Sequence, residues 1–173
     1  MTLLYYYYTN TIKQDLLTKF VYENVQQLPS LNKIVLNFAV SQATLKNLLP
    51  SLGALLLISS QNPCLVASKR LNLILKVKGG VTIGCKVDLR EKDMFLFLEK
   101  LIFNVLPRLK AFRYTIMEKN VFFKVNNIFL FKEIEKEYEY FQDLPRLDVN
   151  LNFKATSSKE IQAFLSALKF PLL

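Results

Sequence analysis

The chain has 173 residues, of which 51% are hydrophobic, and its 23 Lys or Arg outnumber 14 Asp or Glu, giving a formal net charge of +9. This length and apolar content predict one domain that buries its own core, and they exclude bulk disorder. Because the chain has two cysteines, Cys64 and Cys85, and no histidine, a His-containing zinc site and a Cys–His nucleophile are excluded. We expect two buried free thiols in a reducing compartment, with a disulfide as the alternative.

The N-terminal third predicts a helix, a strand and a second helical region. Residues 10–22 place apolar side chains four residues apart, as in an amphipathic helix. Residues 33–40 alternate like a strand with one buried face. Residues 41–59 have a helical, largely apolar pattern, but Pro50 and Gly53 predict that one helix ends or kinks there and another begins.

Two further features of the sequence bear on membranes and targeting. No run reaches the roughly 18 consecutive apolar residues of a membrane span. Residues 1–12 carry no Lys or Arg, unlike the start of a secretory or import peptide. We therefore expect no membrane partner, and we expect the protein to act where it is made unless a targeting segment lies outside this chain.

The middle of the chain predicts two long strands joined by a basic connection. The strands span residues 64–77 and 82–89, and the glycines at 79 and 80 separate them. A helix is predicted for residues 91–106, where apolar side chains recur at helical spacing. Pro107 ends it.

The last third predicts strand, strand and helix. Residues 120–131 indicate one strand or a pair of strands, and residues 148–154 alternate clearly between apolar and polar side chains. The helix over residues 157–168 opens with an S-x-x-E capping box. Together these elements predict an α+β fold with a mainly antiparallel sheet flanked by helices, a single domain over residues 1–173 and a protruding basic loop.

The positive charge is concentrated in residues 61–124, the basic belt, which hold thirteen Lys or Arg against five Asp or Glu. A belt of this kind predicts a surface that meets a polyanion, with RNA as the leading candidate; surface charge that only aids solubility is the alternative. The candidate phosphate ligands are Lys69, Arg70, Lys76, Lys78, Lys86, Arg90, Arg108 and Arg113. In a strand, Lys86, Asp88 and Arg90 would share one face.

Catalytic chemistry has little support in this sequence. The acidic run at residues 133–139 alternates with lysines and is typical of a solvated face. The glycines at 79, 80 and 84 lack the spacing of a phosphate-binding or dinucleotide-binding loop. We predict no catalytic residue, no metal, no cofactor and no small-molecule substrate.

Two polar or aromatic features leave alternatives open. The residues Tyr5 to Tyr8 can stack on bases or can anchor the first helix to the core. Asn37 lies on the polar side of its predicted strand, where an amide can pair with RNA or can be an ordinary edge-strand residue.

Several ordered segments resemble one known family. They are Tyr7-Tyr8, Phe20 to Tyr22, Val25 to Pro29, Lys33 to Asn37, Ile58 to Pro63, Ile83 to Arg90, Pro107-Arg108, Phe112-Arg113, Leu147 to Lys154, Ala155 to Leu168 and Phe170-Pro171. In this order they are similar to the bacterial-type large-subunit ribosomal protein number five, the family that binds 5S ribosomal RNA. The resemblance covers most of the chain.

The resemblance implies an antiparallel sheet flanked by helices, in the central protuberance of the large ribosomal subunit. Expected partners are 5S rRNA, large-subunit rRNA, P-site tRNA and neighbouring ribosomal proteins. Matching positions make Asn37, Gln61, Lys69 and Arg70 candidate RNA contacts, with Lys86 and Arg90 on the strand that follows. The loop 71–80, with Lys76, Lys78, Gly79 and Gly80, corresponds to the arm that approaches tRNA.

The sequence also departs from the family pattern. Asp88 stands where the family usually has a hydroxyl residue, and residues 114–127 lack the family's glycines. Scarce Gly with abundant Phe, Leu, Tyr, Asn and Lys predicts an organelle-encoded protein of a mitochondrial ribosome, with a plastid or a bacterial cytoplasm as alternatives. A free RNA-binding or RNA-chaperone domain outside the ribosome is the alternative function.

Overall fold

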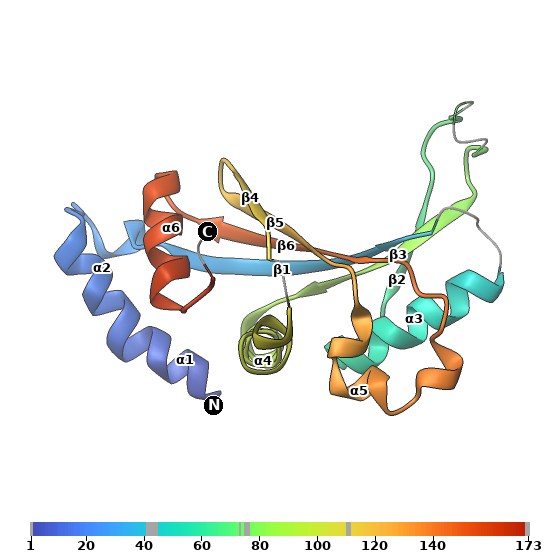
Figure 1. Cartoon of the computed structure of the whole chain (residues 1–173). Helices are drawn as coiled ribbons and strands as arrows, with labels where there is room; N and C mark the ends of the chain where they lie inside the picture. The colour runs from blue at the N-terminus through green and yellow to red at the C-terminus, as the bar shows by residue number, and fades with distance from the viewer. Residues whose placement is uncertain (1, 41–44, 73, 75–76, 110–111, 172–173) are drawn as a thin grey trace. The chain divides into compact units, whose positions relative to one another are not determined.

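The computed structural model describes residues 2–40, 45–72, 74, 77–109 and 112–171. Six strands form one mainly antiparallel sheet in the order β2-β3-β1-β6-β5-β4, and helices accompany it, which confirms the predicted α+β class (Figure 1). The strands are β1 (Ser30–Ala39), β2 (Cys64–Ala67), β3 (Thr82–Leu89), β4 (Tyr114–Met117), β5 (Asn120–Val125) and β6 (Leu147–Lys154).

The chain divides into two compact units. Unit 1 contains Met1–Ile34, Leu89–Phe123 and Asn150–Leu173, and unit 2 contains Val35–Asp88 and Lys124–Val149. The single domain expected over residues 1–173 stays a prediction. None of the helices in the described ranges is both long and apolar enough to cross a membrane.

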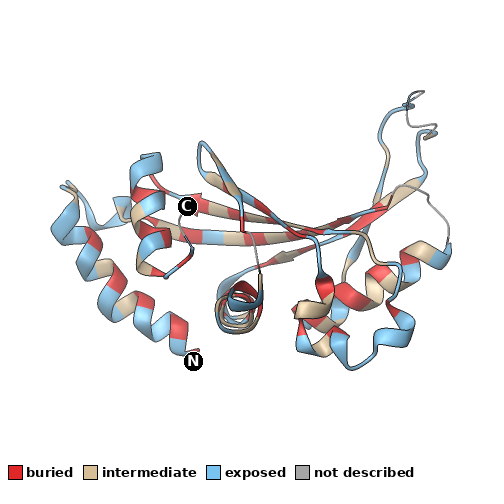
Figure 2. Cartoon of the chain, in the orientation of Figure 1, coloured by how far each residue is buried: buried red, intermediate tan, exposed pale blue. Residues whose placement is uncertain are grey.

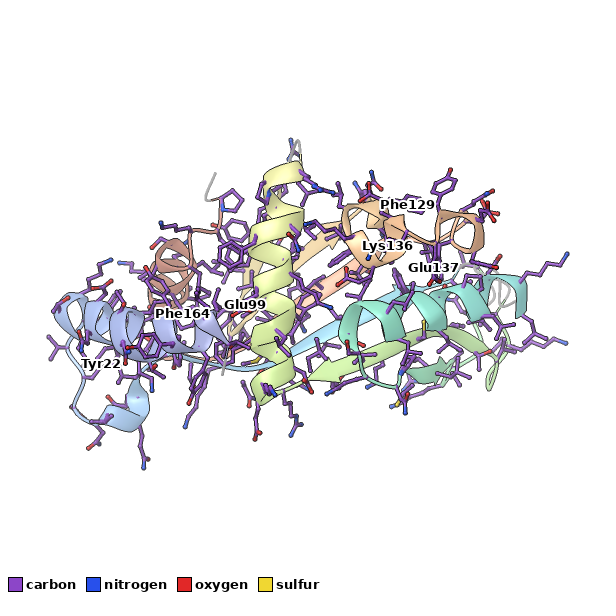
Figure 3. The ribbon with its side chains drawn as sticks, turned by 90° about the horizontal axis from the view of Figure 1, so that it is seen from below. Tyr22, Glu99, Phe129, Lys136, Glu137 and Phe164 are labelled. Atoms are coloured by element: carbon purple, nitrogen blue, oxygen red, sulfur yellow. The ribbon has the colours of Figure 1, made fainter. Side chains whose placement is uncertain are left out.

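Unit 1 begins with a helix that is longer than predicted. It runs through α1 (Leu3–Tyr7), a π-helical turn (Tyr8–Ile12) and α2 (Lys13–Lys19). The early start has a physical cause, because the first backbone donors of a helix need partners from outside it. The Oγ1 atom of Thr2 accepts from the Tyr5 N–H at 3.4 Å, and Oε1 of Glu99 accepts from the Leu4 N–H at 2.8 Å (Figure 3).

Glu99 belongs to the second helix of unit 1, α4 (Glu91–Lys100). A π-helical turn (Leu101–Val105) and a 3-10 turn (Leu106–Arg108) follow α4, so Pro107 lies within the final turn rather than just beyond the helix.

The third helix, α6 (Ser158–Ala167), has the predicted capping residues. The hydroxyl of Ser157 accepts from the Lys159 N–H at 3.1 Å, and the Glu160 carboxylate accepts from the Thr156 N–H at 3.0 Å. Two backbone donors at the helix start are thereby satisfied.

Aromatic packing holds the first helix against α4 and α6. The buried Tyr8 ring lies 5.9 Å from Phe95 and 5.6 Å from Phe164, centroid to centroid, and its hydroxyl donates to the Pro29 carbonyl at 3.4 Å. Burial, followed by the nearby Tyr5, raises the pKa of Tyr8. The anchoring alternative is therefore correct for Tyr8, whereas Tyr6 is exposed (Figure 2).

In unit 2, α3 (Leu45–Ser59) and the short α5 (Lys132–Glu135) lie on the same side of the strands of this unit (Figure 1). The predicted break at Pro50 and Gly53 is wrong, because α3 continues through both residues. A Cβ on Gly53 would lie 3.5 Å from the Phe141 ring, so the glycine sits at a packing contact. Burial of the apolar face of α3 outweighs the low helix propensity of proline and glycine.

Two predicted strands are shorter than expected. The strand predicted over residues 64–77 ends at Ala67, where its register with β3 shifts, and beyond it only the isolated Asn72–Val77 bridge continues the ladder in the described part of this segment. The prediction for residues 120–131 is also partly wrong, since β5 ends at Val125. There the Asn127 carboxamide oxygen accepts from the Phe129 N–H at 3.1 Å and starts a 3-10 turn.

Five described positions have a left-handed backbone, and only one of them is glycine. Gly80 has φ 84°, and the others are Ser60 (56°), Glu91 (47°), Glu118 (53°) and Lys169 (57°). The last ends α6 in a Schellman arrangement, in which the Phe170 N–H donates to the Leu165 carbonyl at 3.1 Å. Side chains disfavour this conformation, so these turns are held by the structure around them.

The two cysteines are free thiols, but they differ in exposure, which corrects the expectation that both are buried. Cys64 is exposed on β2, whereas Cys85 is fully buried on β3 and burial raises its pKa from 9.0 to about 11. We expect a thiol reagent at pH 8 to modify Cys64 alone in the folded protein and both cysteines after unfolding, as counted by mass spectrometry. A Cys64→Ser variant that still reacted rapidly would contradict this prediction.

The same shift predicts how stability depends on pH. A group whose pKa is higher in the folded state than in the unfolded state stabilises the protein below its unfolded pKa, and that contribution is lost as pH rises through the folded value. Cys85 should therefore lower the unfolding midpoint between about pH 9 and 11, and a Cys85→Ala variant should lack this part of the decline.

Candidate nucleic-acid interface

The connection between β2 and β3 is the basic arm, residues 68–81, of which the structure describes 68–72, 74 and 77–81. Two backbone hydrogen bonds close its base, from Ser68 N–H to the Val81 carbonyl and from Gly80 N–H to the Ser68 carbonyl, each 2.8 Å. Farther out, Asn72 and Val77 exchange bonds of 2.9 and 3.0 Å. Figure 1 shows the arm leaving the strands of unit 2 on the side away from α3 and α5.

The described arm carries the predicted cations in exposed positions. Lys69, Arg70 and Lys78 are exposed, and Gly79 and Gly80 form the predicted turn. The positive φ of Gly80 explains why glycine is needed there. The prediction for Lys76 lies outside the described residues.

A hollow of about 900 Å³ lies at the base of this arm. Its wall includes Ser68, Lys69 and Arg70 from the arm, with Val40 and Ile83 from the neighbouring strands. The Val40 N–H donates to the Ile83 carbonyl at 2.9 Å, so the floor is part of the sheet. Because its described lining residues include two cations and no carboxylate, this hollow is suited to an anionic group.

The adjoining sheet surface contains Lys86 and Asn37. Both occupy the less buried face of their strands, opposite the buried Cys85 and Phe38, and β3 and β1 are neighbours in the sheet. Lys86 is exposed and Asn37 is half-buried. Asp88 lies on the same face of β3 as predicted, half-buried, with its Oδ1 atom shielded from solvent.

Gln61 is held just after α3, at a tight chain reversal. Its backbone N–H donates to the hydroxyl of the buried Ser59 at 3.2 Å, and Ser60 between them adopts a left-handed backbone. The Gln61 residue itself is half-buried. Unit 2 therefore contains Asn37, Gln61, Lys69, Arg70, Lys78 and Lys86 of the predicted set.

The other predicted cations belong to unit 1. Arg90 follows the end of β3 and occupies the N-cap of α4, Arg108 lies in the last turn after α4, and Arg113 precedes β4. All three are exposed. The basic belt is thus divided between the two units. Within the described ranges, no cluster of three or more His, Cys, Asp or Glu side chains is placed to hold a metal ion.

Comparison with known proteins identifies the family. The sequence profile for the C-terminal part of the ribosomal uL5 family matches residues 82–172. The large ribosomal subunit protein uL5 of Wolbachia pipientis wMel is 36% identical over 171 residues, 95% of this chain and 96% of that protein. Its counterpart in Buchnera aphidicola subsp. Baizongia pistaciae is 34% identical over 178 residues, 99% and 98% of the two chains. In Wigglesworthia glossinidia brevipalpis the identity is 35% over 175 residues, 97% of each. The chain belongs to the ribosomal uL5 family.

Membership in the uL5 family makes the chain a structural constituent of the large ribosomal subunit. The family is not known to be enzymatic, in agreement with the prediction drawn from the residues. The resemblance noted in the sequence is therefore confirmed at the level of the family.

One polar feature of this uL5-family chain was missed in the sequence. Three asparagines form a row across β1, β6 and β5: Asn32 donates to Asn152 at 3.0 Å, and Asn152 donates to Asn120 at 2.8 Å. All three belong to unit 1. The alternating pattern of residues 148–154 indicated that Asn152 faces away from the core, but the register that aligns it with Asn32 and Asn120 depends on strand pairing distant in sequence.

Proposed function

We propose that this uL5-family chain binds 5S rRNA and large-subunit rRNA through the basic arm and the adjoining face of unit 2. The tip of the arm, in this proposal, reaches toward P-site tRNA. The observation that carries the proposal is the exposed pair Lys69 and Arg70 beside a hollow that has no carboxylate among its described lining residues. Phosphate neutralisation by such cations supplies sequence-independent affinity, while amides such as Asn37 and Gln61 add positional contacts.

Asp88 sets a limit on where RNA approaches. A carboxylate on the same strand face as Lys86 repels phosphate unless cations compensate for it. The proposed phosphate contacts are therefore concentrated at the arm and its base, with Lys86 at the margin. Neighbouring ribosomal proteins would cover other parts of the surface.

The tRNA-proximal part of the proposal is tested at the arm. We expect a Lys76→Glu, Lys78→Glu variant to fold normally and to weaken subunit assembly and translation, because reversed charge repels RNA phosphates. Co-sedimentation with large subunits in sucrose gradients at moderate salt measures incorporation, and translation by the purified subunits measures function. Normal assembly and translation with this variant would refute the role of the arm.

For the compartment, we infer a mitochondrial ribosome with an organelle-encoded gene, which rests on composition: the chain has only 4 Gly but 14 Phe and 8 Tyr. The compared relatives are bacterial proteins. Fractionation of the source cells with an antibody against the chain tests this inference, since recovery in a bacterial cytoplasm or a plastid would overturn it.

A further inference from the structure

A second hollow, the unit 1 pocket, lies away from the basic arm in sequence and has a volume of about 590 Å³. Its lining combines aromatic and apolar side chains (Tyr5, Tyr8, Met94 and Phe95) with polar ones at Asn32 and Lys154. The volume falls within the range of about 300–1,000 Å³ that is typical of small-ligand sites. We propose that this pocket receives one unstacked nucleobase of single-stranded RNA, which deepens the proposed rRNA-binding function and rests on it.

The aromatic wall has a ring available for stacking. Tyr8 is buried and fixed by its neighbours, whereas Tyr5 keeps 40% of its surface exposed. Phe95 holds the Tyr5 ring edge to face, with centroids 5.2 Å apart and planes at 78°. This contact fixes the orientation of the Tyr5 ring from one side and leaves exposed surface toward the pocket. A base stacks on such a ring without regard to sequence.

The polar rim can contact the edges of the base and the phosphate. Asn32 donates one N–H to Asn152, and this bond fixes the plane of its amide. Its oxygen and second N–H can then meet the donor and acceptor groups of a base.

Charge at the rim also fits a nucleotide. Lys92 and Lys154 are both exposed lining residues, suited to the phosphate. Glu91 also lines the pocket and would repel a phosphate placed against it, so the phosphate is expected on the Lys154 side.

The absence of tryptophan from the chain allows a direct test. In a Tyr5→Trp variant the new indole is the sole tryptophan, and its fluorescence should be quenched when unlabelled 12-mers of single-stranded oligo(A) or oligo(U) bind. A Tyr6→Trp variant is the matched control, because Tyr6 is on the same helix, 66% exposed and outside the pocket lining. Its fluorescence should stay unchanged at the same RNA occupancy, measured separately by anisotropy of labelled RNA.

Affinity measurements separate stacking from charge. Tyr5→Phe should bind the 12-mers like the wild type, and Tyr5→Leu should bind about tenfold more weakly with an unchanged salt dependence. Lys154→Ala should reduce the slope of log K against log salt by about 0.7. Lys159→Ala, an exposed site on α6 outside the pocket, should leave that slope unchanged.

Either of two results would overturn the inference: an unquenched indole in Tyr5→Trp at saturating RNA, or wild-type affinity in Tyr5→Leu together with an unchanged slope in Lys154→Ala. Thermal unfolding of each variant verifies that it is folded, and Lys154→Ala removes an exposed side chain, so it tests the pocket even if changes at Tyr5 perturb the helix. The proposed function fails separately, if the wild type neither binds large-subunit rRNA nor responds to charge reversal in the basic arm. Binding of rRNA by Tyr5→Trp without quenching would refute the pocket alone.

Discussion

Replacing Gly84 by alanine is expected to remove a large part of the stability of the fold. A Cβ at this position would overlap the carbonyl oxygen of Phe38 on the adjacent strand and lie 3.3 Å from the carbonyl carbon. Backbone cannot rotate away as a flexible side chain can, so β1 and β3 would have to separate locally. Overpacking of this kind typically costs about 1–3 kcal/mol and occasionally more, and the backbone contact places Gly84→Ala at the upper end.

Denaturant unfolding followed by circular dichroism measures this effect. Gly53→Ala is the matched control, because the new Cβ would lie at an ordinary 3.5 Å from the Phe141 ring in the middle of α3. Alanine is favoured over glycine in a helix by about 1 kcal/mol, so this control should be neutral or stabilising. Equal stability losses in the two variants would show that the contact between β1 and β3 does not require glycine.

Reversing the charge at Lys69 and Arg70 should weaken binding to a 5S rRNA transcript by about 100-fold at roughly 0.15 M salt. A single phosphate contact contributes roughly fivefold at this salt concentration, given a slope of about −0.9 per contact. Loss of two contacts accounts for roughly 30-fold, and repulsion by the new carboxylates adds the remainder. The slope of log K against log salt should also fall by about 2.

Lys132→Glu with Lys136→Glu is a control with the same change in charge within unit 2 (Lys136 is labelled in Figure 3). Both lysines are exposed, but they lie in or just after α5, on the side of the strands opposite the arm (Figure 1). This control should lose much less affinity, because only the long-range change in net charge remains. If both pairs weakened binding equally, net charge rather than the arm would account for the affinity.

The strands could be predicted from the sequence where a single face is buried. Residues 148–154 and 82–89 alternate, and both are strands within one residue of the predicted bounds. The segment 64–77 contains β-favouring residues, but β2 lacks a fully buried face, so side-chain pattern alone did not fix its end. The break predicted at Pro50 failed because the tertiary packing of α3 overrides local propensity.

The candidate site could be predicted as far as charge and exposure reach. Lys69, Arg70 and Lys78 are exposed in the described arm because nothing in its short backbone ladder buries a side chain. The unit 1 pocket could not be predicted, since Tyr5, Asn32, Phe95 and Lys154 come from four separate elements. Contacts of that kind depend on tertiary packing, which leaves no local periodicity in the sequence.

The left-handed turns have a consequence for how the fold tolerates mutation. Ser60, Glu91, Glu118 and Lys169 each hold a backbone conformation that costs a residue with a side chain roughly 1–2 kcal/mol. The lower unfolded-state entropy of a non-glycine residue offsets about 0.5–1 kcal/mol of this. Summed over four turns, the remainder is a sizeable share of the roughly 5–15 kcal/mol that keeps a domain folded. A glycine-poor version of this fold therefore stands closer to its unfolding threshold, and it can absorb fewer later substitutions than a version with glycine at these turns.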